Sequence, residues 1–112
     1  MEINKHIDWL QDFYEERGWY KLSSEIRMNF LIEEVGELSR AIRAIELGRH
    51  HPGEATLTEV DKMDNLKEEL SDVMDQVFII CRKYDLNPED LFTYGENKIN
   101  KRWHRDEGEN HV

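Results

Sequence analysis

Apolar side chains recur every three or four residues along most of the chain, the spacing that gathers them on one face of an α-helix. The first such stretch predicts a helix over residues 3–17, which Gly18 ends. The second predicts a longer helix over residues 24–47, which ends before Gly48. Its predicted apolar face consists of Ile26, Phe30, Leu38, Ala41, Ile42 and Ile45. Since neither pattern alternates with the period of a strand, the first half of the chain is expected to be helical.

A third helix is expected to form the centre of the core. Residues 48–56 contain both Gly and Pro and have no periodicity, so we expect an exposed and mobile loop there. Helical periodicity resumes near Asp61 and continues without interruption. The predicted packing face of this helix consists of Met63, Leu66, Leu70, Val73, Met74, Val77, Ile80, Cys81 and Tyr84.

The last helix has the clearest start signal. Asn87 is a suitable cap, Pro88 suits the first helical position, and two acidic residues follow in the first turn. The helix is expected to run to about Trp103, and the polar tail from about residue 104 to fray. No linker or repeat divides the chain, so residues 1–112 are interpreted as one all-α domain, a four-helix bundle.

Composition narrows the possible functions. With 38% hydrophobic residues and only two prolines, the chain has enough apolar surface to fold as a helical domain. A net charge of −10 disfavours duplex nucleic acid and membranes as partners, and a phosphate-bearing ligand would need a bridging cation or a local basic patch. Because neither a membrane span nor a leader segment is evident, we expect a cytoplasmic protein. The single cysteine, Cys81, is expected to be a buried thiol.

Carboxylates interrupt the apolar face of the second helix. When this helix is projected at about 100° per residue, Glu34 falls near the middle of the apolar arc and Glu37 inside it. Glu33 falls just beyond the edge. Because an ionised carboxylate on a buried face costs several kcal/mol, a cation or hydrogen-bond donors must compensate Glu34.

The third helix repeats this spacing. Glu69 and Asp72 share a polar strip beside its apolar face, while Glu68 points away. Two helices packed side by side would bring four carboxylates to one point: Glu34, Glu37, Glu69 and Asp72. Such an all-oxygen site suits Mg²⁺, for which Mn²⁺ can substitute. Solvated acidic faces without a metal remain an alternative, whereas a di-iron bundle is disfavoured because no histidine follows a Glu by three residues.

The two acidic motifs together resemble the signature of a known enzyme family. The segments Glu33-Glu34-Val35-Gly36-Glu37-Leu38 and Glu68-Glu69-Leu70-Ser71-Asp72-Val73 are similar to the paired Glu-Glu-x-x-Glu and Glu-x-x-Asp motifs of MazG-like pyrophosphohydrolases. The resemblance extends from Trp9 through Arg102 and implies that Mg²⁺ is held by the four carboxylates named above. The superfamily includes dUTPases and phosphoribosyl-ATP pyrophosphohydrolases, so the resemblance does not choose the base or sugar.

The same resemblance implies substrate contacts at both ends of the chain. In the family the last helix often contacts phosphate and sugar, and here that helix carries Lys98, Asn100, Lys101 and Arg102. The alternative interpretation is that the lysine and arginine side chains offset the dipole at the C-terminus of the helix. Trp19 matches a place where an aromatic side chain contacts the base, and is expected to stack on it. Trp9 and Phe13 are expected in the core. Gln76 departs from relatives that have an aromatic residue there.

The expected activity is Mg²⁺-dependent hydrolysis of a nucleoside triphosphate, such as a deoxynucleotide or a non-standard nucleotide, to the monophosphate and pyrophosphate. Glu37 or Glu33 is expected to act as the catalytic base, and attack at the α or β phosphorus stays open. The alternative is a helical metal-binding or protein-interaction module without this chemistry.

A homodimer or homotetramer is expected. Ile79 on the third helix, and Met28 and Ile32 on the second, lie outside the predicted packing faces. A single layer of four helices cannot cover all of these apolar positions, and uncovered patches usually mark interfaces. Two-fold association would also bring the basic last helix of one subunit beside the carboxylates of another.

Overall fold

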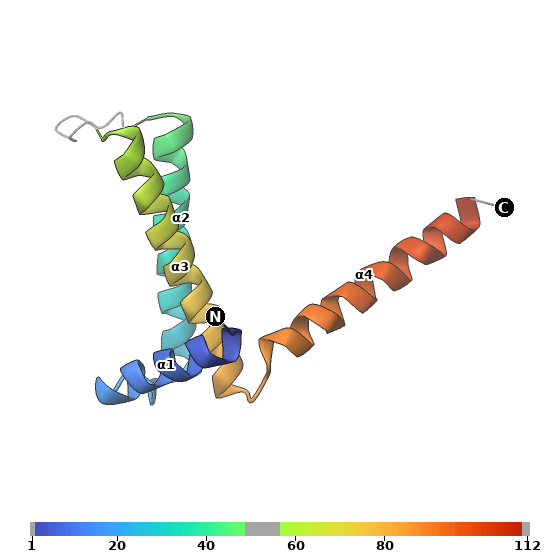
Figure 1. Cartoon of the computed structure of the whole chain (residues 1–112), viewed down its shortest axis with the longest axis horizontal. Helices are drawn as coiled ribbons and strands as arrows, with labels where there is room; N and C mark the ends of the chain where they lie inside the picture. Colours follow the sequence, from blue (N-terminus) through green and yellow to red (C-terminus); the bar gives the residue numbers. More distant parts are fainter. Residues whose placement is uncertain (1, 49–56, 111–112) are drawn as a thin grey trace.

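A computed structural model describes residues 2–48 and 57–110, with side chains described up to Trp103. It contains four helices, α1 (Ile3–Glu16), α2 (Ser24–Glu46), α3 (Glu59–Lys83) and α4 (Pro88–Asn110), and no strand in this part of the chain (Figure 1). The predicted all-α class is confirmed, and the predicted helix starts agree within about two residues. The loop expected at residues 48–56 lies outside the described residues except for Gly48, where φ is +78°.

Local capping explains where the two long helices begin. The Ser23 hydroxyl accepts a hydrogen bond from the Ile26 amide at 3.3 Å, and the Thr58 hydroxyl accepts one from the Asp61 amide at 3.1 Å. Each cap satisfies an amide that has no partner within its own helix. The caps therefore set the residues at which α2 and α3 begin. The two helices pack side by side and run antiparallel along their whole length (Figure 1).

The face that α2 packs against α3 differs from the predicted one. Ile26, Phe30 and Ile42, expected on the buried face, are exposed. Leu38, Ala41 and Ile45 of the predicted face are buried or half-buried, and so are Arg27, Leu31, Glu34 and Ala44. Their spacing of three and four residues is that of a helix-helix seam. Apolar residues cover about half of the circumference of α2. Periodicity alone therefore does not show which part of this arc packs against a neighbouring helix.

α3 also shows a different buried face. Ile79, predicted to lie outside the packing face, is fully buried, and Cys81 is buried as expected. Several residues of the predicted packing face are exposed: Met63, Leu70, Met74, Val77 and Tyr84. The reason is that α3 meets α2 along one side and α1 at its C-terminal end, which leaves its third side uncovered within one chain.

α1 crosses the end of the α2–α3 pair and is fastened to α3 (Figure 1). Ile7 and Leu10 are its buried side chains. The His6 Nε2 atom lies 2.7 Å from the Asp75 Oδ1 atom, and Arg82 donates at 2.9 Å to Asp8. These contacts determine which side of α1 packs against α3. As a result, the aromatic residues of α1 lie beside α3.

α4 forms no extensive packing contact with another helix in the described part of the chain. It projects from the end of α3 and continues to Asn110, past the predicted end near Trp103 (Figure 1). The radius of gyration is 18.9 Å, against about 13 Å for a compact chain of this length. The predicted four-helix bundle is therefore not closed within one chain, because nothing in α1–α3 receives α4.

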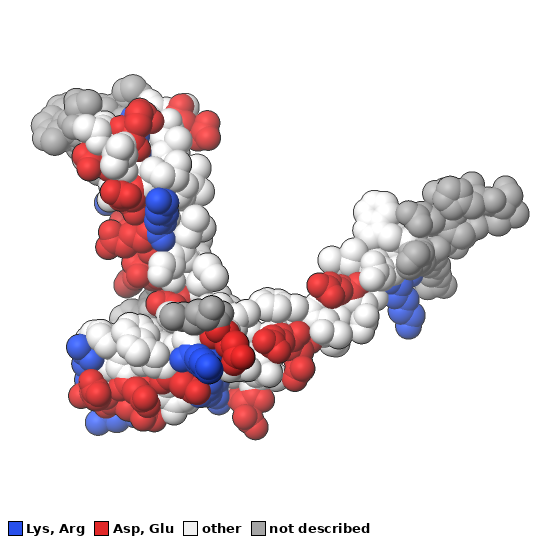
Figure 2. Space-filling model, in the orientation of Figure 1, with Lys and Arg blue, Asp and Glu red and all other residues white. Residues whose placement is uncertain are grey.

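Much of the uncovered surface lacks charge. Figure 2 shows surface without charged side chains along one side of the α2–α3 pair and on parts of the coloured portion of α4. Exposed large apolar side chains on α4 include Phe92, Ile99 and Trp103. Within the described residues, no helix has both the length and the apolarity needed to cross a membrane.

Candidate metal centre and its flanking pockets

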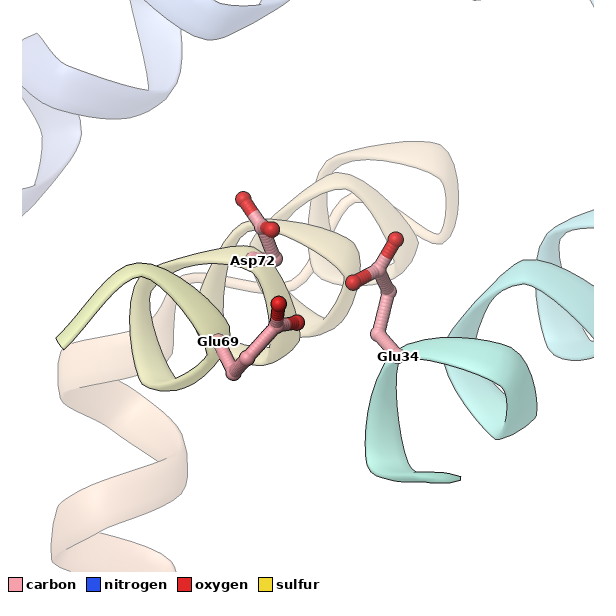
Figure 3. Close-up of side chains that lie close together, drawn as sticks. All are labelled: Glu34, Glu69 and Asp72. Carbon is pink, nitrogen blue, oxygen red and sulfur yellow. The ribbon is translucent and has the colours of Figure 1, made fainter. Parts of the chain in front are cut away.

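Three acidic side chains meet at the middle of the α2–α3 pair. Glu34 of α2 points across to Glu69 and Asp72 of α3 (Figure 3). Each offers one carboxylate oxygen, and these three oxygens all lie within 4.8 Å of one another. The antiparallel packing of the two helices at the half-buried position of Glu34 brings this cluster together, as the motif spacing predicts.

Burial and mutual repulsion raise the pKa of all three carboxyl groups. For Glu34 and Glu69, loss of solvent is the main cause, followed by the charge of Asp72. For Asp72, burial is followed by the charge of Glu68. The Glu69 Oε2 atom is buried without a hydrogen-bond partner. Crowded acidic oxygens with an unpartnered buried atom fit a hard divalent cation, which would replace repulsion by attraction.

Glu37 and Glu33 lie at the border of this cluster. Glu37 is exposed, and its Oε2 atom lies 3.8 Å from the Arg40 Nη1 atom, although its charge still raises the pKa of Glu34 and Glu69. Glu33 is exposed on the same helix. The structure thus brings together three of the four predicted metal ligands, and Glu37 lies outside this group.

An aromatic pocket of about 530 Å³ opens on one side of the carboxylates. Glu34 and Asp72 form part of its wall, and the rest includes Trp9, Phe13, Tyr14, Trp19 and Phe30. Trp9 and Phe13 stack with centroids 5.6 Å apart, and Trp19 meets Phe13 edge-on. The expectation that Trp9 belongs to the core is wrong, since 59% of it is exposed. Its place beside the pocket explains why it extends the apolar face of α1.

The floor of the aromatic pocket contains a buried arginine that the sequence pattern did not reveal. Arg27 is 1% exposed and donates to the Trp19 and Tyr20 carbonyl oxygens, the latter at 2.7 Å. Burial lowers the pKa of its guanidinium group. It forms no ion pair with any described residue, and its Nε atom has no partner. Arg27 therefore ties the α1–α2 connection, and with it Trp19, to α2.

Gln76 and Tyr14 supply the polar edge of the same pocket. The Gln76 amide donates to the Tyr14 hydroxyl at 3.0 Å, and its Oε1 atom is buried without a partner. Burial is the main cause of the raised pKa of Tyr14. Exchanging the amide oxygen and nitrogen would still leave one polar atom unpaired. Gln76, which departs from the expected aromatic residue, thus presents unused hydrogen-bonding capacity to the pocket.

A second, smaller pocket of about 180 Å³ opens on the other side of the carboxylates and is hereafter called the charged pocket. α2 contributes Glu37 and Arg40 to its lining, and α3 contributes Lys62, Asn65 and Glu69. Its floor comes from Ala41 and Ala44, whose small side chains leave space between the helices. Sequence reasoning assigned no role to Arg40 or Lys62, because a cation three residues from a Glu on a helix usually forms an ordinary surface pair.

The basic residues of α4 are not beside the carboxylates. Lys98, Asn100, Lys101 and Arg102 are all exposed on the helix that projects away from α2 and α3. Their predicted contact with substrate therefore has no counterpart within a single chain. Trp19, by contrast, does lie in a pocket that borders the carboxylates.

These features define an all-helical protein whose acidic centre lies between two antiparallel helices. The MazG nucleotide pyrophosphohydrolase domain matches residues 22–105, and the chain belongs to this family. It is 39% identical over 103 residues, covering 92% of this chain and 97% of the relative, to the uncharacterized protein YvdC of Bacillus subtilis (strain 168). No solved structure gives a significant match. The predicted family is thereby confirmed.

Proposed function

We propose that this protein hydrolyses nucleoside triphosphates to the monophosphate and pyrophosphate with the help of Mg²⁺, for which Mn²⁺ can substitute. The observation that carries the proposal is the crowding of Glu34, Glu69 and Asp72 around one point, with a buried unpartnered oxygen on Glu69. Family membership supports the same chemistry. Glu37, whose charge raises the pKa of Glu34 and Glu69, is proposed as the fourth ligand.

The reaction adds one water across the anhydride between the α and β phosphates. The water oxygen bonds to one of these phosphorus atoms, the bridging P–O bond breaks, and its electron pair remains on the departing oxygen. A bound divalent cation shields the phosphate charge and lowers the pKa of water. Glu37 or Glu33 takes the proton that the water gives up, since both lie at the border of the cluster and keep solvent access.

The aromatic pocket is proposed to receive the nucleoside. Its volume of about 530 Å³ falls in the usual range for small-molecule sites, and its wall includes two carboxylates of the cluster. Trp19 stacks on the base, which is favourable for any base and therefore does not choose one. A deoxynucleotide or non-standard nucleotide is the substrate that we expect, and Gln76 is the side chain placed to discriminate among bases.

The active form is proposed to be a homodimer or homotetramer. Uncovered apolar residues on α2, α3 and α4 need a partner surface, and α4 packs extensively against no described part of α1–α3. A second subunit can receive α4, so that Lys98, Asn100, Lys101 and Arg102 of one subunit approach the carboxylates of another. The proposed location is the cytoplasm, where nucleotides are available.

Pyrophosphate release from a panel of standard and damaged nucleotides, with and without Mg²⁺, tests the activity. We expect metal-dependent formation of equal amounts of monophosphate and pyrophosphate from at least one triphosphate. Release of inorganic phosphate in place of pyrophosphate would contradict the proposed bond cleavage. Mg²⁺ binding without turnover of any nucleotide would favour the alternative, a helical metal-binding or protein-interaction module.

A further inference from the structure

The carboxylate cluster separates two pockets of opposite chemistry. Glu34 and Asp72 border the aromatic pocket, whereas Glu37 and Glu69 border the charged pocket. In the aromatic pocket the only lysine or arginine among the described residues is Arg27, whose guanidinium already donates to two backbone carbonyl oxygens. A triphosphate reaching the cluster from the aromatic side must therefore find positive charge elsewhere.

We propose that the charged pocket holds the terminal phosphates of the substrate and then the pyrophosphate product, with Lys62 and Arg40 as the cationic contacts and Asn65 as a neutral donor. This inference rests on the proposed function and adds to it the orientation in which the substrate binds. The nucleoside lies toward α1, and the phosphate chain crosses the carboxylates toward the start of α3. The side of the cluster opposite the aromatic pocket is where the leaving group ends.

Lys62 is suited to this contact because its present partner is weak. Its side chain is only 15% exposed, while that of Glu59, whose Oε1 atom lies 3.2 Å from Nζ, is 84% exposed. Because the Glu59 carboxylate is largely in solvent, water competes with this pair and the pair contributes little free energy. A phosphate oxygen with greater charge, approaching the sheltered ammonium, can replace the Glu59 carboxylate at low cost.

Arg40 is available for a related reason. Its Nη1 atom lies 3.8 Å from the Glu37 Oε2 atom, a long contact between two exposed side chains. If Glu37 turns toward a cation at the cluster, Arg40 loses this partner at the moment when phosphate charge arrives. The planar guanidinium can then donate two hydrogen bonds to one phosphate group. The hollow above Ala41 and Ala44 provides the space for that group.

The test compares Lys62→Met and Arg40→Met with the matched control Lys67→Met, a lysine exposed on the same helix and outside the pocket. Calorimetry with Mg²⁺ measures binding of inorganic pyrophosphate and of nucleoside monophosphate separately. We expect each pocket variant to bind pyrophosphate about tenfold more weakly, with unchanged monophosphate affinity and melting temperature, and the control to resemble wild type.

Steady-state kinetics provide the second measurement. The KM for triphosphate should rise in the pocket variants, and pyrophosphate should inhibit them less as a product. Unchanged pyrophosphate affinity in both variants, or an equal loss in Lys67→Met, would overturn the proposal. Because calorimetry uses pyrophosphate and metal without turnover, a wild-type protein that hydrolyses no nucleotide would refute the proposed function while this test still decides whether the pocket binds pyrophosphate.

Discussion

α2 and α4 each contain 23 residues but stand in opposite environments. α2 lies against α3 along its whole length and holds a carboxylate at the interface, whereas α4 packs extensively against no other helix in the described residues. The α4 start shows that local signals suffice to begin a helix: the Asn87 carboxamide oxygen accepts from the Glu89 amide at 3.0 Å, and Pro88 follows the cap. These local signals do not determine which surface α4 packs against, because that surface belongs to a distant part of the chain or to another subunit. One chain thus brings three of the four predicted metal ligands together, whereas the basic residues of α4 lie away from them.

The largest effect is expected at the carboxylates. Glu34→Gln and Asp72→Asn each remove one charged ligand with little change in volume, so pyrophosphate release should fall by about a hundredfold or more. Circular dichroism should show unchanged helicity. The matched control is Glu68→Gln, because Glu68 is exposed beside Glu69 and does not enter the cluster. Wild-type rates in either ligand variant would exclude the metal site.

The next effect tests whether α4 acts on a neighbouring subunit. A double variant, Lys98→Met with Arg102→Met, should lose about tenfold in activity, since phosphate contacts are removed. Mixing it with Glu34→Gln and allowing subunits to exchange should restore roughly a quarter of wild-type activity, because half of the dimers then contain one intact site.

Failure to restore activity on mixing would mean that each chain uses its own α4. Sedimentation equilibrium accompanies the mixing experiment: a stable, active species at the chain mass of 13.5 kDa would refute both the dimer and the shared site.

A smaller effect is expected at Gln76. Replacement by Met keeps the length of the side chain but removes the buried amide, so relative rates for different bases should change by up to about tenfold. The kcat for the best remaining base should stay close to wild type, because the carboxylates are untouched. Identical base preferences in wild type and Gln76→Met would show that the unpaired amide atom does not contact the base.

The smallest effect concerns stability without metal. The folded-state pKa values of Glu34, Glu69 and Asp72 are raised, so their contribution to stability is fully present below the ordinary carboxyl pKa of about 4 and is lost as pH rises through the raised values. In EDTA, Glu34→Gln should therefore melt close to wild type near pH 4 and a few degrees higher near pH 7.

Added Mg²⁺ should raise the melting temperature of wild type more than that of Glu34→Gln. A metal-free Glu34→Gln protein that is markedly less stable than wild type at neutral pH would contradict the repulsion among these carboxylates. Calorimetric scans in EDTA and in Mg²⁺ over this pH range provide both comparisons.

The acidic centre was predictable because its spacing is a local property. Glu34 falls within the apolar arc of α2, and Glu69 and Asp72 share a strip of α3, so packing the two helices brings them together. The exact seam was not predictable: Arg27 is buried where Ile26 was expected. A helix that is apolar over half its surface has several arcs of similar hydrophobicity, and the neighbouring helix decides among them.

The pockets and the position of α4 depend on contacts between distant parts of the chain. Trp9 widens the apolar face of α1 in the sequence, but only the crossing of α1 over α3 makes it a pocket wall. Lys62 resembles any cation beside a Glu until α2 places Ala41 and Ala44 opposite it. For α4, no helix in the described part of one chain covers its exposed apolar residues, so these residues support the proposed partner subunit without identifying the surface that α4 would contact.

The family match begins at Leu22 and therefore leaves out α1, which builds much of the aromatic wall, while the three clustered carboxylates all fall inside it. In the proposed function the acidic cluster carries the chemistry and the aromatic pocket receives the base, so α1 contributes to the pocket and not to the cluster. A different first helix grafted onto an unchanged α2–α3 pair is therefore expected to change nucleotide preference while metal-dependent hydrolysis is retained.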